Sequence, residues 1–439
     1  MEQIIPDFIQ DAANRFAEDP FTVQIDGADV FLPDDARELR SRAREFVAEH
    51  VAPLAARIDR DNETPYELRR NMAEAGFFGL SIPEEYGGQG SVLQTCLAVE
   101  EFSRLSASIG LIVAVGLLGS TPLVLAGAEK QKQDWLPGFA AGERFSSFCL
   151  TEPGAGTDAA SVSTSVSSNG DGYTLNGLKH YITGAGWSDL YTVFARSGDG
   201  DYEMTAMLLP AGTPGFDVQG RHPFTGIRGI PVGQLTFDRV ALPDEAVLGE
   251  PGRGFQVALA TLDRARPAIA AQAIGVAQGA YDAAISYLGN RVQFGKPLLQ
   301  KDVIQHRLAR HAASLAAGRM LTYHAARMAD EDRPELNSAA SMAKLYCTDL
   351  AMQVVTDAVQ FCGGAGYMVG SPVERMYRDV KIMQIYEGTN EIQEMVISRA
   401  LMRKYENVTS EVDSWRRMVG AAACPRRPYR TYVPPPCAR

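Results

Sequence analysis

The sequence predicts a mainly α-helical α+β protein in which a β domain, a barrel or sandwich, separates two helical domains. Apolar residues recur at three- and four-residue spacings before about residue 147 and again after about residue 253, as in amphipathic helices. Between these regions, short apolar runs of strand length alternate with turn residues. The predicted units are an N-terminal arm, a helical domain, the β domain, a C-terminal four-helix bundle and a partly disordered tail, spanning residues 1–32, 33–147, 148–252, 253–406 and 407–439.

The N-terminal helical domain opens with an amphipathic segment. Its apolar side chains share one helical face, which consists of Leu39, Ala43, Phe46, Val47 and Leu54. Arg40, Arg44 and Glu49 fall outside this face. The run Asn62–Pro65 ends the segment, because polar turn residues followed by proline interrupt a helix.

An uncharged stretch from Leu105 to Ala128 is long enough to cross a bilayer. It also contains glycines and Pro122, and no second stretch of this kind occurs in the sequence. A buried helix followed by a break accounts for it better than a membrane span does.

The sequence pattern of the middle third predicts a β domain. The turn Asn169–Gly172 precedes strand-forming residues at Tyr173–Leu175. Further strand-length runs follow at Leu190–Phe194, Met204–Leu209 and Gln234–Phe237. After residue 253 the pattern predicts four helices. The first begins near Gly254, and the other three cover Ile304–Met328, Ser338–Phe361 and Glu391–Arg403.

Charge and composition exclude several classes of protein. The chain has 53 acidic and 42 basic residues and a net charge of −11, which disfavours binding to a nucleic-acid backbone. The six cysteines are scattered without a CxxC pair, so we expect reduced thiols and a cytoplasmic protein. The six histidines lack the spacing of a metal site, and none is predicted.

The segment Cys149–Asp158 is the first that carries chemistry. Gly154, Gly156 and Ala159 mimic a dinucleotide fingerprint, but serines and a turn follow where that motif needs a helix. A glycine-rich turn that brings backbone amides and hydroxyls close to a flat ligand is the better interpretation.

Two further segments have both a ligand-binding and a purely structural interpretation. Tyr181 and Thr183, two residues apart on a strand, point the same way and suit a ring system, although spacing alone favours an ordinary strand. Arg291 and Lys296, between two helices, can meet a phosphate or remain solvated loop charges.

The last two segments lie in the C-terminal region. In Gln360–Tyr367, paired glycines permit close approach of a nucleotide or simply cap a helix. Glu387, between Tyr386 and Gly388, sits in an apolar setting that raises a carboxyl pKa and strengthens a general base. Taken alone, Glu387 is also explained as an acid at a helix start.

In this order and at these separations, the segments resemble the acyl-CoA dehydrogenase family. The resemblance runs from Pro33 to Arg403. The segments that carry it are Ile82–Gly88, Leu150–Asp158, Arg291–Gly295 and Ile385–Gln393.

The resemblance implies an FAD between the β domain and the C-terminal helices, with Tyr181 at the family's usual Trp or Phe position. It also implies a homo-oligomer, by family habit a tetramer, because part of the cofactor site would come from a neighbouring subunit. The residues that would contact FAD are Phe148, Leu150, Thr151, Gly156, Thr157, Tyr181, Thr183, Arg291, Gln293, Phe294, Gln360, Gly363, Gly364, Thr389 and Glu391.

By the same resemblance, Glu387 is the base that removes the α-proton of an acyl-CoA or acyl-carrier thioester, while the β-hydrogen leaves as hydride to FAD. The product would be a trans-2-enoyl thioester, and an electron-transfer flavoprotein would be the oxidant. Some members instead carry the catalytic carboxylate at the position that Ala265 occupies here, and alanine cannot serve as a base. The substrate-side residues would be Thr157, Asp263, Arg266 and Gly388.

Lys301–Asp302 and Gly184–Gly186 depart from the family pattern, and either can weaken retention of FAD. Two alternatives keep the fold and change the activity. One is an oxidase or monooxygenase that uses dioxygen, and the other is a non-catalytic binding protein. The uncharged Leu105–Ala128 stretch matches the region that lines the acyl pocket, which favours an apolar acyl chain over a dicarboxylate.

Overall fold

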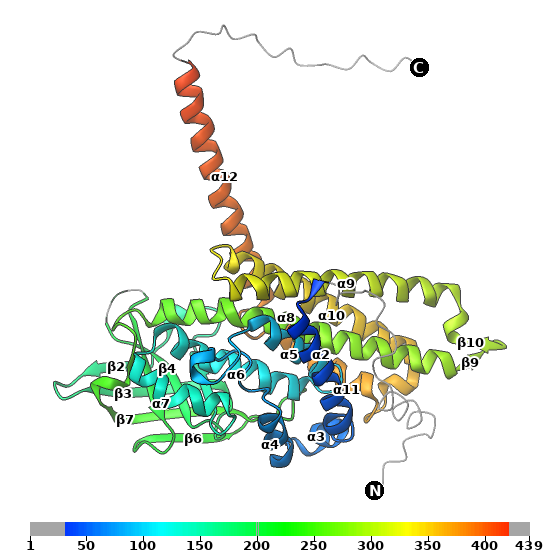
Figure 1. The fold of residues 1–439 in the computed structure, drawn as a ribbon, viewed down its shortest axis with the longest axis horizontal. Helices are drawn as coiled ribbons and strands as arrows, with labels where there is room; N and C mark the ends of the chain where they lie inside the picture. Colours follow the sequence, from blue (N-terminus) through cyan, green and yellow to red (C-terminus); the bar gives the residue numbers. More distant parts are fainter. Residues whose placement is uncertain (1–30, 199, 201, 421–439) are drawn as a thin grey trace.

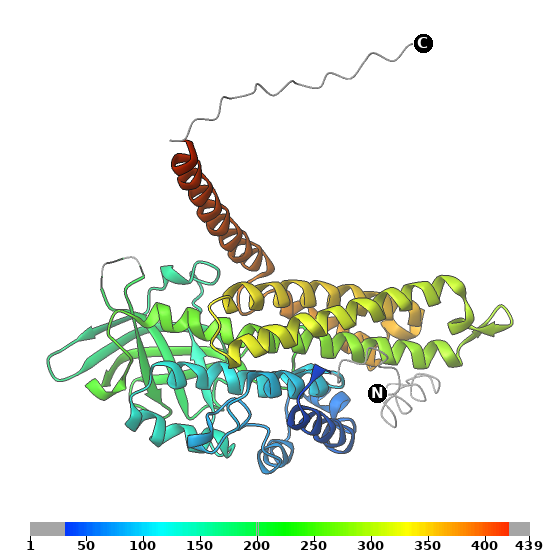
Figure 2. The same cartoon turned by 45° about the horizontal axis from the view of Figure 1, so that its top comes forward.

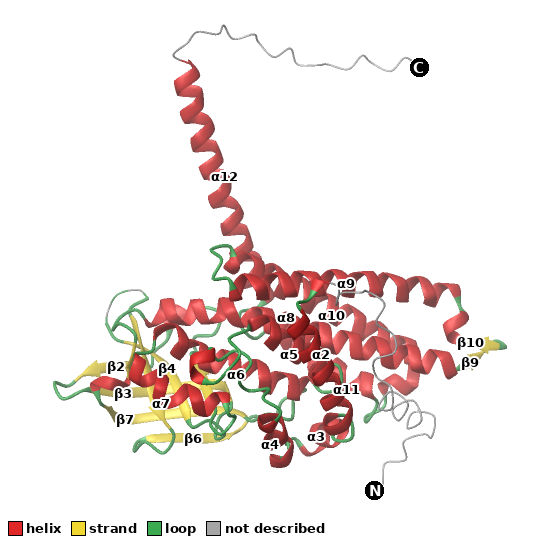
Figure 3. Ribbon diagram, in the orientation of Figure 1, coloured by secondary structure: helices red, strands yellow, loops and turns green. Residues whose placement is uncertain are grey.

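The computed structural model describes residues 31–198, 200 and 202–420, with side chains described up to residue 405. The β domain lies at one end of an elongated body and the long helices run from it to the other end (Figure 1). Colouring by secondary structure separates the sheet from the surrounding helices (Figure 3). Almost all of the predicted N-terminal arm, and the tail beyond residue 420, lie outside the described residues.

The N-terminal domain is helical, as predicted. Its helices are α2 (Asp34–Phe46), η2 (Val47–Val51), α3 (Ala55–Asp61), α4 (Tyr66–Glu74), η3 (Glu84–Tyr86), α5 (Val92–Ser103), α6 (Ala107–Ala126) and α7 (Glu129–Ala140). The predicted apolar face of α2 is buried in the core together with α5.

Arg40 corrects the sequence-based description of α2. The apolar pattern placed Arg40 outside the buried face, but its side chain is fully buried. Its Nε donates to Glu101 at 2.5 Å and its Nη2 to Glu100 at 3.2 Å. A buried guanidinium is tolerated when carboxylates pair with it, and periodicity of apolar residues cannot report such a pair.

Helix α6 agrees with the predicted buried helix followed by a break. It continues through Pro122 to Ala126, and the extended residues Gly127 and Ala128 then separate it from α7. The hydroxyls of Ser120 and Thr121 donate to carbonyls of the preceding turn, those of Gly116 and Leu117. By length and composition α6 could cross a membrane, but 67% of its most apolar window is buried inside the protein, as in the core helix of a globular protein.

The β domain is one eight-stranded sheet in the order β6-β7-β3-β2-β4-β5-β8, with β1 paired to β4 in parallel. The strands are β1 (Ser146–Cys149), β2 (Ser165–Ser168), β3 (Tyr173–Thr183), β4 (Leu190–Arg196), β5 (Met204–Pro210), β6 (Phe216–Arg221), β7 (Val232–Leu242) and β8 (Val247–Leu248). Leu175, Val193, Leu209 and Leu235 belong to its own apolar core.

The C-terminal domain is built around α8, whose alanine-rich surface allows close packing against α5, α6, α9 and α10. Its elements are α8 (Gly254–Asn290), β9 (Val292–Gln293), β10 (Lys296–Pro297), η6 (Leu298–Gln300), α9 (Asp302–Asp330), α10 (Leu336–Cys362), η7 (Gly363–Tyr367), α11 (Pro372–Val380), η8 (Lys381–Gln384) and α12 (Asn390–Gly420). These elements confirm the predicted order of helical, β and helical regions.

Helix α12 projects away from the body in both views (Figures 1 and 2). It runs without interruption from Asn390 to Gly420. Residues 407–420, which the domain prediction assigned to the tail, continue this helix. The proline- and arginine-rich segment from Pro425 to Arg439, on which the prediction of disorder rests, lies outside the described residues.

Candidate active site

The fold brings the first two sequence motifs together beside strand β3, in the interior of the sheet. The backbone N–H of His180 donates to the carbonyl oxygen of Thr151 at 2.8 Å. The buried Nζ of Lys179 donates to the carbonyl oxygen of Leu150 and to the carboxylate of Glu152, each at 2.8 Å. Thr151 and Tyr181 therefore lie on neighbouring segments, as a shared ligand site requires.

The glycine-rich turn leads into no α-helix. Only a three-residue 3₁₀ turn follows, Ala159–Ser161, before the chain reaches β2. Glu152 holds this connection, because its carboxylate accepts from the backbone N–H groups of Ser163 at 2.6 Å and Thr164 at 2.9 Å. Without a helix N-terminus, the segment is not the dinucleotide fingerprint that Gly154 and Gly156 mimic.

Tyr181 presents an aromatic face to solvent, but not through simple strand alternation. The pairing of β3 with β7 shifts between Lys179 and Ile182, and Tyr181 has a φ of +56°. The expectation that Tyr181 and Thr183 share one face of the strand stays a prediction, and Ile182 between them is the buried residue of the three. The Tyr181 side chain is 57% exposed.

Two aromatic neighbours of Tyr181 were missed from the sequence. The ring of His222 lies 5.6 Å from the Tyr181 ring, and that of Phe224 lies 6.4 Å away. The Nε2 of His222 is buried and has no hydrogen-bond partner among the described residues. No spacing rule could find these residues, because about forty positions separate them from Tyr181 and only the sheet brings them together.

The loop that carries Phe224 is tied to the C-terminal helices. The backbone N–H of Ile227 donates to Asp379 at 2.6 Å, and Arg378 donates to the carbonyl oxygen of Thr225 at 3.1 Å. Burial raises the pKa of Asp379 to about 6. Both residues belong to the end of α11, which leads through η8 to Glu387, so the aromatic cluster and the carboxylate share one framework.

Glu387 lies in the turn between η8 and α12. It has a φ of +53°, followed by +88° at Gly388, and α12 begins three residues later at Asn390. The alternative that Glu387 is an acid of the first helical turn is therefore wrong. Its Oε2 is buried and has no hydrogen-bond partner among the described residues. Burial raises the pKa of Glu387 to about 7, opposed first by the charge of Arg266 and then by that of Lys344.

Of the predicted substrate-side residues, Arg266 contacts Glu387 directly and Asp263 is linked to it through Arg266. Arg266 is buried, its Nη1 donates to Asp263 at 2.7 Å, and its Nε donates to the carbonyl oxygen of Glu387 at 3.4 Å. Burial raises the pKa of the Asp263 carboxyl, and the positive charge of Arg266 reduces this rise. Ala265 lies beside them with its methyl group buried.

The start of α12 holds Thr389 and Glu391 next to this carboxylate. The pKa of the Glu391 carboxyl is lowered, first by a hydrogen bond from the backbone N–H of Glu391 and then by one from the Thr389 side chain. Asn390, which the sequence did not single out, donates to Thr348 at 2.9 Å and to Asp349 at 2.7 Å. Lys344 on α10 was also missed, since a lone lysine inside a helical pattern gives no signal.

The remaining predicted cofactor residues form a separate group at the far end of the helices. Arg291 ends α8, and Gln293 and Phe294 belong to the β9–β10 hairpin, which lies at the opposite end from the sheet (Figure 1). The Phe294 side chain is 96% exposed. Gln360 closes α10, where Gly363 caps the helix with a φ of +59° and Gly364 follows. The structure does not bring these residues to Glu387 within one chain.

The two departures from the family pattern are local. Lys301 precedes α9, and its Nζ lies 5.4 Å from the centre of the Phe294 ring. Gly184 and Gly186 have φ values of +84° and +82° and form the turn after β3. A Cβ at Gly184 would come within 2.8 Å of the hydroxyls of Ser147 and Ser188, so the turn requires glycine there.

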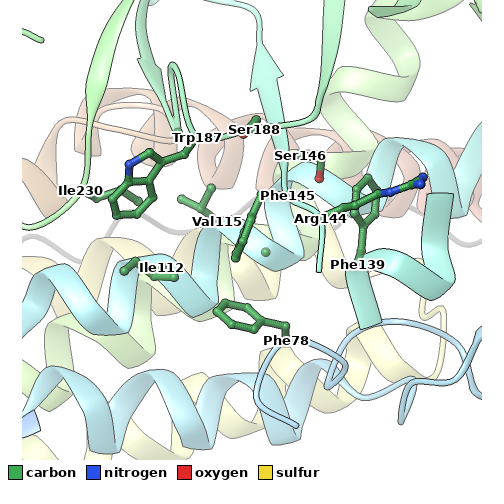
Figure 4. A pocket seen from close by; sticks show the side chains of 12 residues that line it. Phe78, Ile112, Val115, Phe139, Arg144, Phe145, Ser146, Trp187, Ser188 and Ile230 are labelled. Atoms are coloured by element: carbon green, nitrogen blue, oxygen red, sulfur yellow. The ribbon is translucent and has the colours of Figure 1, made fainter. Parts of the chain in front are cut away.

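A largely apolar cavity lies between α6 and the turn that follows β3 (Figure 4). Ile112, Val115 and Gly116 form its α6 wall, and Trp187 and Ser188 form the opposite side. Its other lining residues are Phe78, Phe139, Arg144, Phe145, Ser146, Gly184 and Ile230. The cavity therefore adjoins the strand that carries Tyr181 and Thr183.

Within the described residues, Cys96, Cys149, Cys347 and Cys362 are buried free thiols. No group of three or more potential metal-ligating side chains occurs in that part of the chain.

Comparison with known proteins gives a consistent result. The chain resembles a probable acyl-CoA dehydrogenase, fadE25, of Mycobacterium bovis, with 44% identity over 379 residues, 85% of this chain and 97% of the relative. It resembles the butyryl-CoA dehydrogenase structure from Megasphaera elsdenii with 40% identity, a TM-score of 0.82 and coverage of 84% of this chain and 99% of that one.

Two further solved structures bear on the cofactor and partner. A chain from a structure of the electron transferring flavoprotein of Acidaminococcus fermentans matches with 41% identity and a TM-score of 0.83, covering 85% of this chain and 99% of that one. A glutaryl-CoA dehydrogenase of Mycobacterium smegmatis in complex with FADH2 matches with 29% identity and a TM-score of 0.79, covering 85% and 96%.

Three family descriptions cover nearly all of the described chain. They are the acyl-CoA dehydrogenase N-terminal domain over residues 33–143, the middle domain over 147–240 and the C-terminal domain over 252–402. These boundaries follow the helical, β and helical regions of the structure. The chain therefore belongs to the acyl-CoA dehydrogenase family.

Proposed function

We propose that this chain dehydrogenates an acyl-CoA between its α and β carbons, with Glu387 as the base that accepts the α-proton. The observation that supports this role most directly is the Glu387 carboxyl, which has a buried Oε2 without a hydrogen-bond partner among the described residues. An acid that serves only structure is normally paired when it is buried. An unpaired carboxylate oxygen is instead suited to receive a proton from a bound molecule.

The surroundings of Glu387 suit it to this work. Its pKa of about 7, against 4.5 for an ordinary glutamate, makes its carboxylate a stronger base by about 3 kcal/mol. Arg266 and Lys344 keep the carboxylate form accessible near neutral pH, because both oppose the effect of burial. The turn that carries Glu387 is held on several sides, so the carboxyl is presented in a fixed direction.

The cofactor is proposed to be FAD, which supplies the acceptor for the β-hydride when bound. The residues of this chain fit such a group: Tyr181 offers an open aromatic face, and the orphaned Nε2 of His222 lies beside it. No atom lies within 4 Å of a Cβ built on Gly156, so the glycine-rich turn leaves room for a ligand. We propose that Phe148, Leu150, Thr151, Gly156, Thr157, Tyr181, Thr183, Thr389 and Glu391 hold the cofactor of their own subunit.

The far group of predicted cofactor residues is proposed to serve a neighbouring subunit. Arg291, Gln293, Phe294 and the Gln360–Gly364 segment lie at the end of the helices opposite the sheet (Figure 1). This separation supports an arrangement in which two chains packed head to tail each contribute one group to the same FAD. The exposed Phe294 at the hairpin tip fits such a contact, and a homotetramer is the proposed assembly.

The substrate is proposed to carry an apolar acyl chain on CoA. Helix α6 contributes Ile112, Val115 and Gly116 to the cavity, without a charged side chain. A butyryl-CoA dehydrogenase is among the similar structures, which fits a short chain. Gly388 and Arg266, next to the base, are proposed to face the thioester, and Thr157 is proposed to lie on the path of CoA.

An electron-transfer flavoprotein is the proposed oxidant, in line with the similar chain from the Acidaminococcus fermentans structure. A cytoplasmic location is also proposed, since the four described cysteines are buried free thiols.

The proposal is tested by anaerobic titration of the purified protein with acyl-CoAs of graded length and branching, followed by the visible spectrum of the flavin. Bleaching with a subset of apolar acyl-CoAs, lost in Glu387→Gln at unchanged flavin content, is the expected result. Bleaching that persists in Glu387→Gln would rule out the base. Rapid hydrogen peroxide release in air would favour the oxidase alternative.

A further inference from the structure

Lys344 lies inside α10, and its side chain is fully buried beneath the turn that carries Glu387. Its Nζ donates to the carbonyl oxygen of Gly388 at 2.9 Å and to Oδ1 of Asn390 at 2.8 Å. A buried ammonium is costly unless acceptors and opposite charges surround it. Its two acceptors both come from the residues that immediately follow Glu387.

The backbone that Lys344 holds is strained. Glu387 adopts a left-handed conformation, with a φ of +53°, that a non-glycine residue keeps only when its surroundings impose it. Gln393 on α12 also donates to the Gly388 carbonyl oxygen, at 2.9 Å. Two donors from two different helices therefore converge on one carbonyl and fix the direction of the preceding carboxylate.

Lys344 also places a positive charge near the base. Burial lowers the pKa of Lys344 to about 8, opposed first by the charge of Glu387. Lys344 in turn opposes the effect of burial on Glu387, after Arg266. The other charged or titratable groups around the pair are Arg266 and Asp263 on α8, Asp349 on α10, Glu391 on α12 and Tyr386 beside Glu387.

We propose that Lys344 is a positioning residue for proton transfer, whose ammonium fixes the Glu387–Gly388 backbone and supplies the buried counter-charge of the Glu387 carboxylate. The inference rests on the proposed function of Glu387 as the base. In the proton-transfer step the α-C–H bond breaks, its electron pair stays with the thioester and its proton joins the Glu387 carboxylate. Lys344 keeps its own protons throughout and stabilises the negative form of Glu387 before the transfer.

The experiment compares Lys344→Met, which removes the charge, with Lys344→Arg, which keeps it, in the purified protein with its cofactor. Lys130→Met on the surface of α7 is the matched control, since Lys130 pairs only with Asp134 among the residues described. Infrared difference spectra against Glu387→Gln, recorded without substrate, follow the protonation of the Glu387 carboxyl as pH changes. The rate of flavin reduction by an acyl-CoA is measured over the same pH range.

We expect the titration midpoint of Glu387 to rise by about one unit in Lys344→Met, which is a tenfold fall in the ionised-to-protonated ratio below the midpoint. The rate should fall by about tenfold at pH 6 and approach the wild-type rate at high pH. Lys344→Arg should restore most of the midpoint, and Lys130→Met should leave it unchanged. A role in packing alone would lower the rate equally at every pH.

An unchanged Glu387 midpoint in Lys344→Met overturns the proposal. If this variant does not fold, Lys344→Gln, which retains a donor for the Gly388 carbonyl but no charge, is predicted to shift the midpoint in the same direction, and no shift overturns the proposal. Failure of the proposed function is seen separately. In that case wild-type flavin reduction does not depend on Glu387, whatever the state of Lys344.

Discussion

Arg266 donates from Nε to the carbonyl oxygen of Glu387 at 3.4 Å, across 121 residues of chain. The same guanidinium pairs with Asp263 at 2.7 Å, one helical turn earlier on α8. The long helix α8 thus contacts the turn that carries Glu387, as α10 does through Lys344. Two buried cations from two different helices, Arg266 and Lys344, therefore hold this turn.

Removal of the Arg266 charge is expected to make Glu387 harder to ionise. Arg266 is the largest of the effects that lower the pKa of Glu387, so Arg266→Gln should raise that pKa above about 7. The rising limb of the rate of flavin reduction against pH should then move to higher pH, by about one unit. Arg264→Gln, two residues away on α8 and paired with Asp332, is the matched control and should leave the limb in place. An identical pH profile in both variants would contradict this prediction.

Glu387→Gln is expected to stabilise the folded protein at alkaline pH. The folded pKa of Glu387, about 7, lies above its ordinary value of 4.5, so its contribution to stability is full below about pH 4.5 and is lost as pH rises through 7. Glutamine stays neutral, and Glu387→Gln should therefore be more stable than wild type by up to about 3 kcal/mol at pH 8.5, with little difference near pH 4.5. Urea unfolding at both pH values measures this.

Glu391→Gln serves as the control for that measurement. The pKa of Glu391 is lowered in the folded state, so its ionised form is the stabilising one above its unfolded pKa. Its replacement should give no gain in stability at pH 8.5. A gain of equal size in both variants would mean that net charge, and not the burial of Glu387, governs the effect.

The buried charge cluster between α2, α5 and α9 is expected to be essential for stability. Glu100 accepts from Arg319 at 2.6 Å, from Arg40 at 3.2 Å and from Tyr323 at 2.7 Å. Glu100→Gln removes the buried carboxylate that Arg319 and Arg40 share, although Arg40 keeps Glu101, and should lower the free energy of unfolding by about 3–5 kcal/mol. Asp134→Asn, in the exposed pair with Lys130, should change it by less than about 1 kcal/mol. Urea denaturation compares the two variants.

Arg291→Ala is expected to weaken retention of FAD without altering the active site. If Arg291 meets the pyrophosphate of a neighbouring subunit's cofactor, loss of a charge-assisted hydrogen bond should raise the FAD dissociation constant about tenfold or more. Flavin fluorescence released on dilution measures it. Lys130→Ala on the surface of α7, in an exposed pair with Asp134, is the control and should leave the dissociation constant unchanged. Equal retention by wild type and Arg291→Ala would exclude this role, while Glu387-dependent reduction of the bound flavin should persist.

Part of this protein could be predicted from the local sequence. Apolar spacing identified the face of α2, and turn residues delimited the strands of the sheet. Glu387 was singled out because an acid between Tyr386 and Gly388 is unusual in so apolar a run. These features depend on neighbours in the chain, which is why they are visible without a structure.

The tertiary structure decided the features that depend on distant partners. Arg40 is buried because Glu100 and Glu101 meet it from α5, although its own helix pattern placed it outside the apolar face. Helix α6 continues through Pro122 while it is packed in the core, and His222 and Phe224 lie beside Tyr181 only in the folded sheet.

The sequence by itself determined the order of helical and β regions and, through the family resemblance, proposed Glu387 as the base. The tertiary structure decided the environment of the Glu387 carboxyl, since burial raises its pKa while Arg266 and Lys344 limit the rise. The physical reason is the range of each interaction. Backbone preferences and apolar periodicity act over a few residues, whereas burial and charge act through space between segments that only the fold brings together.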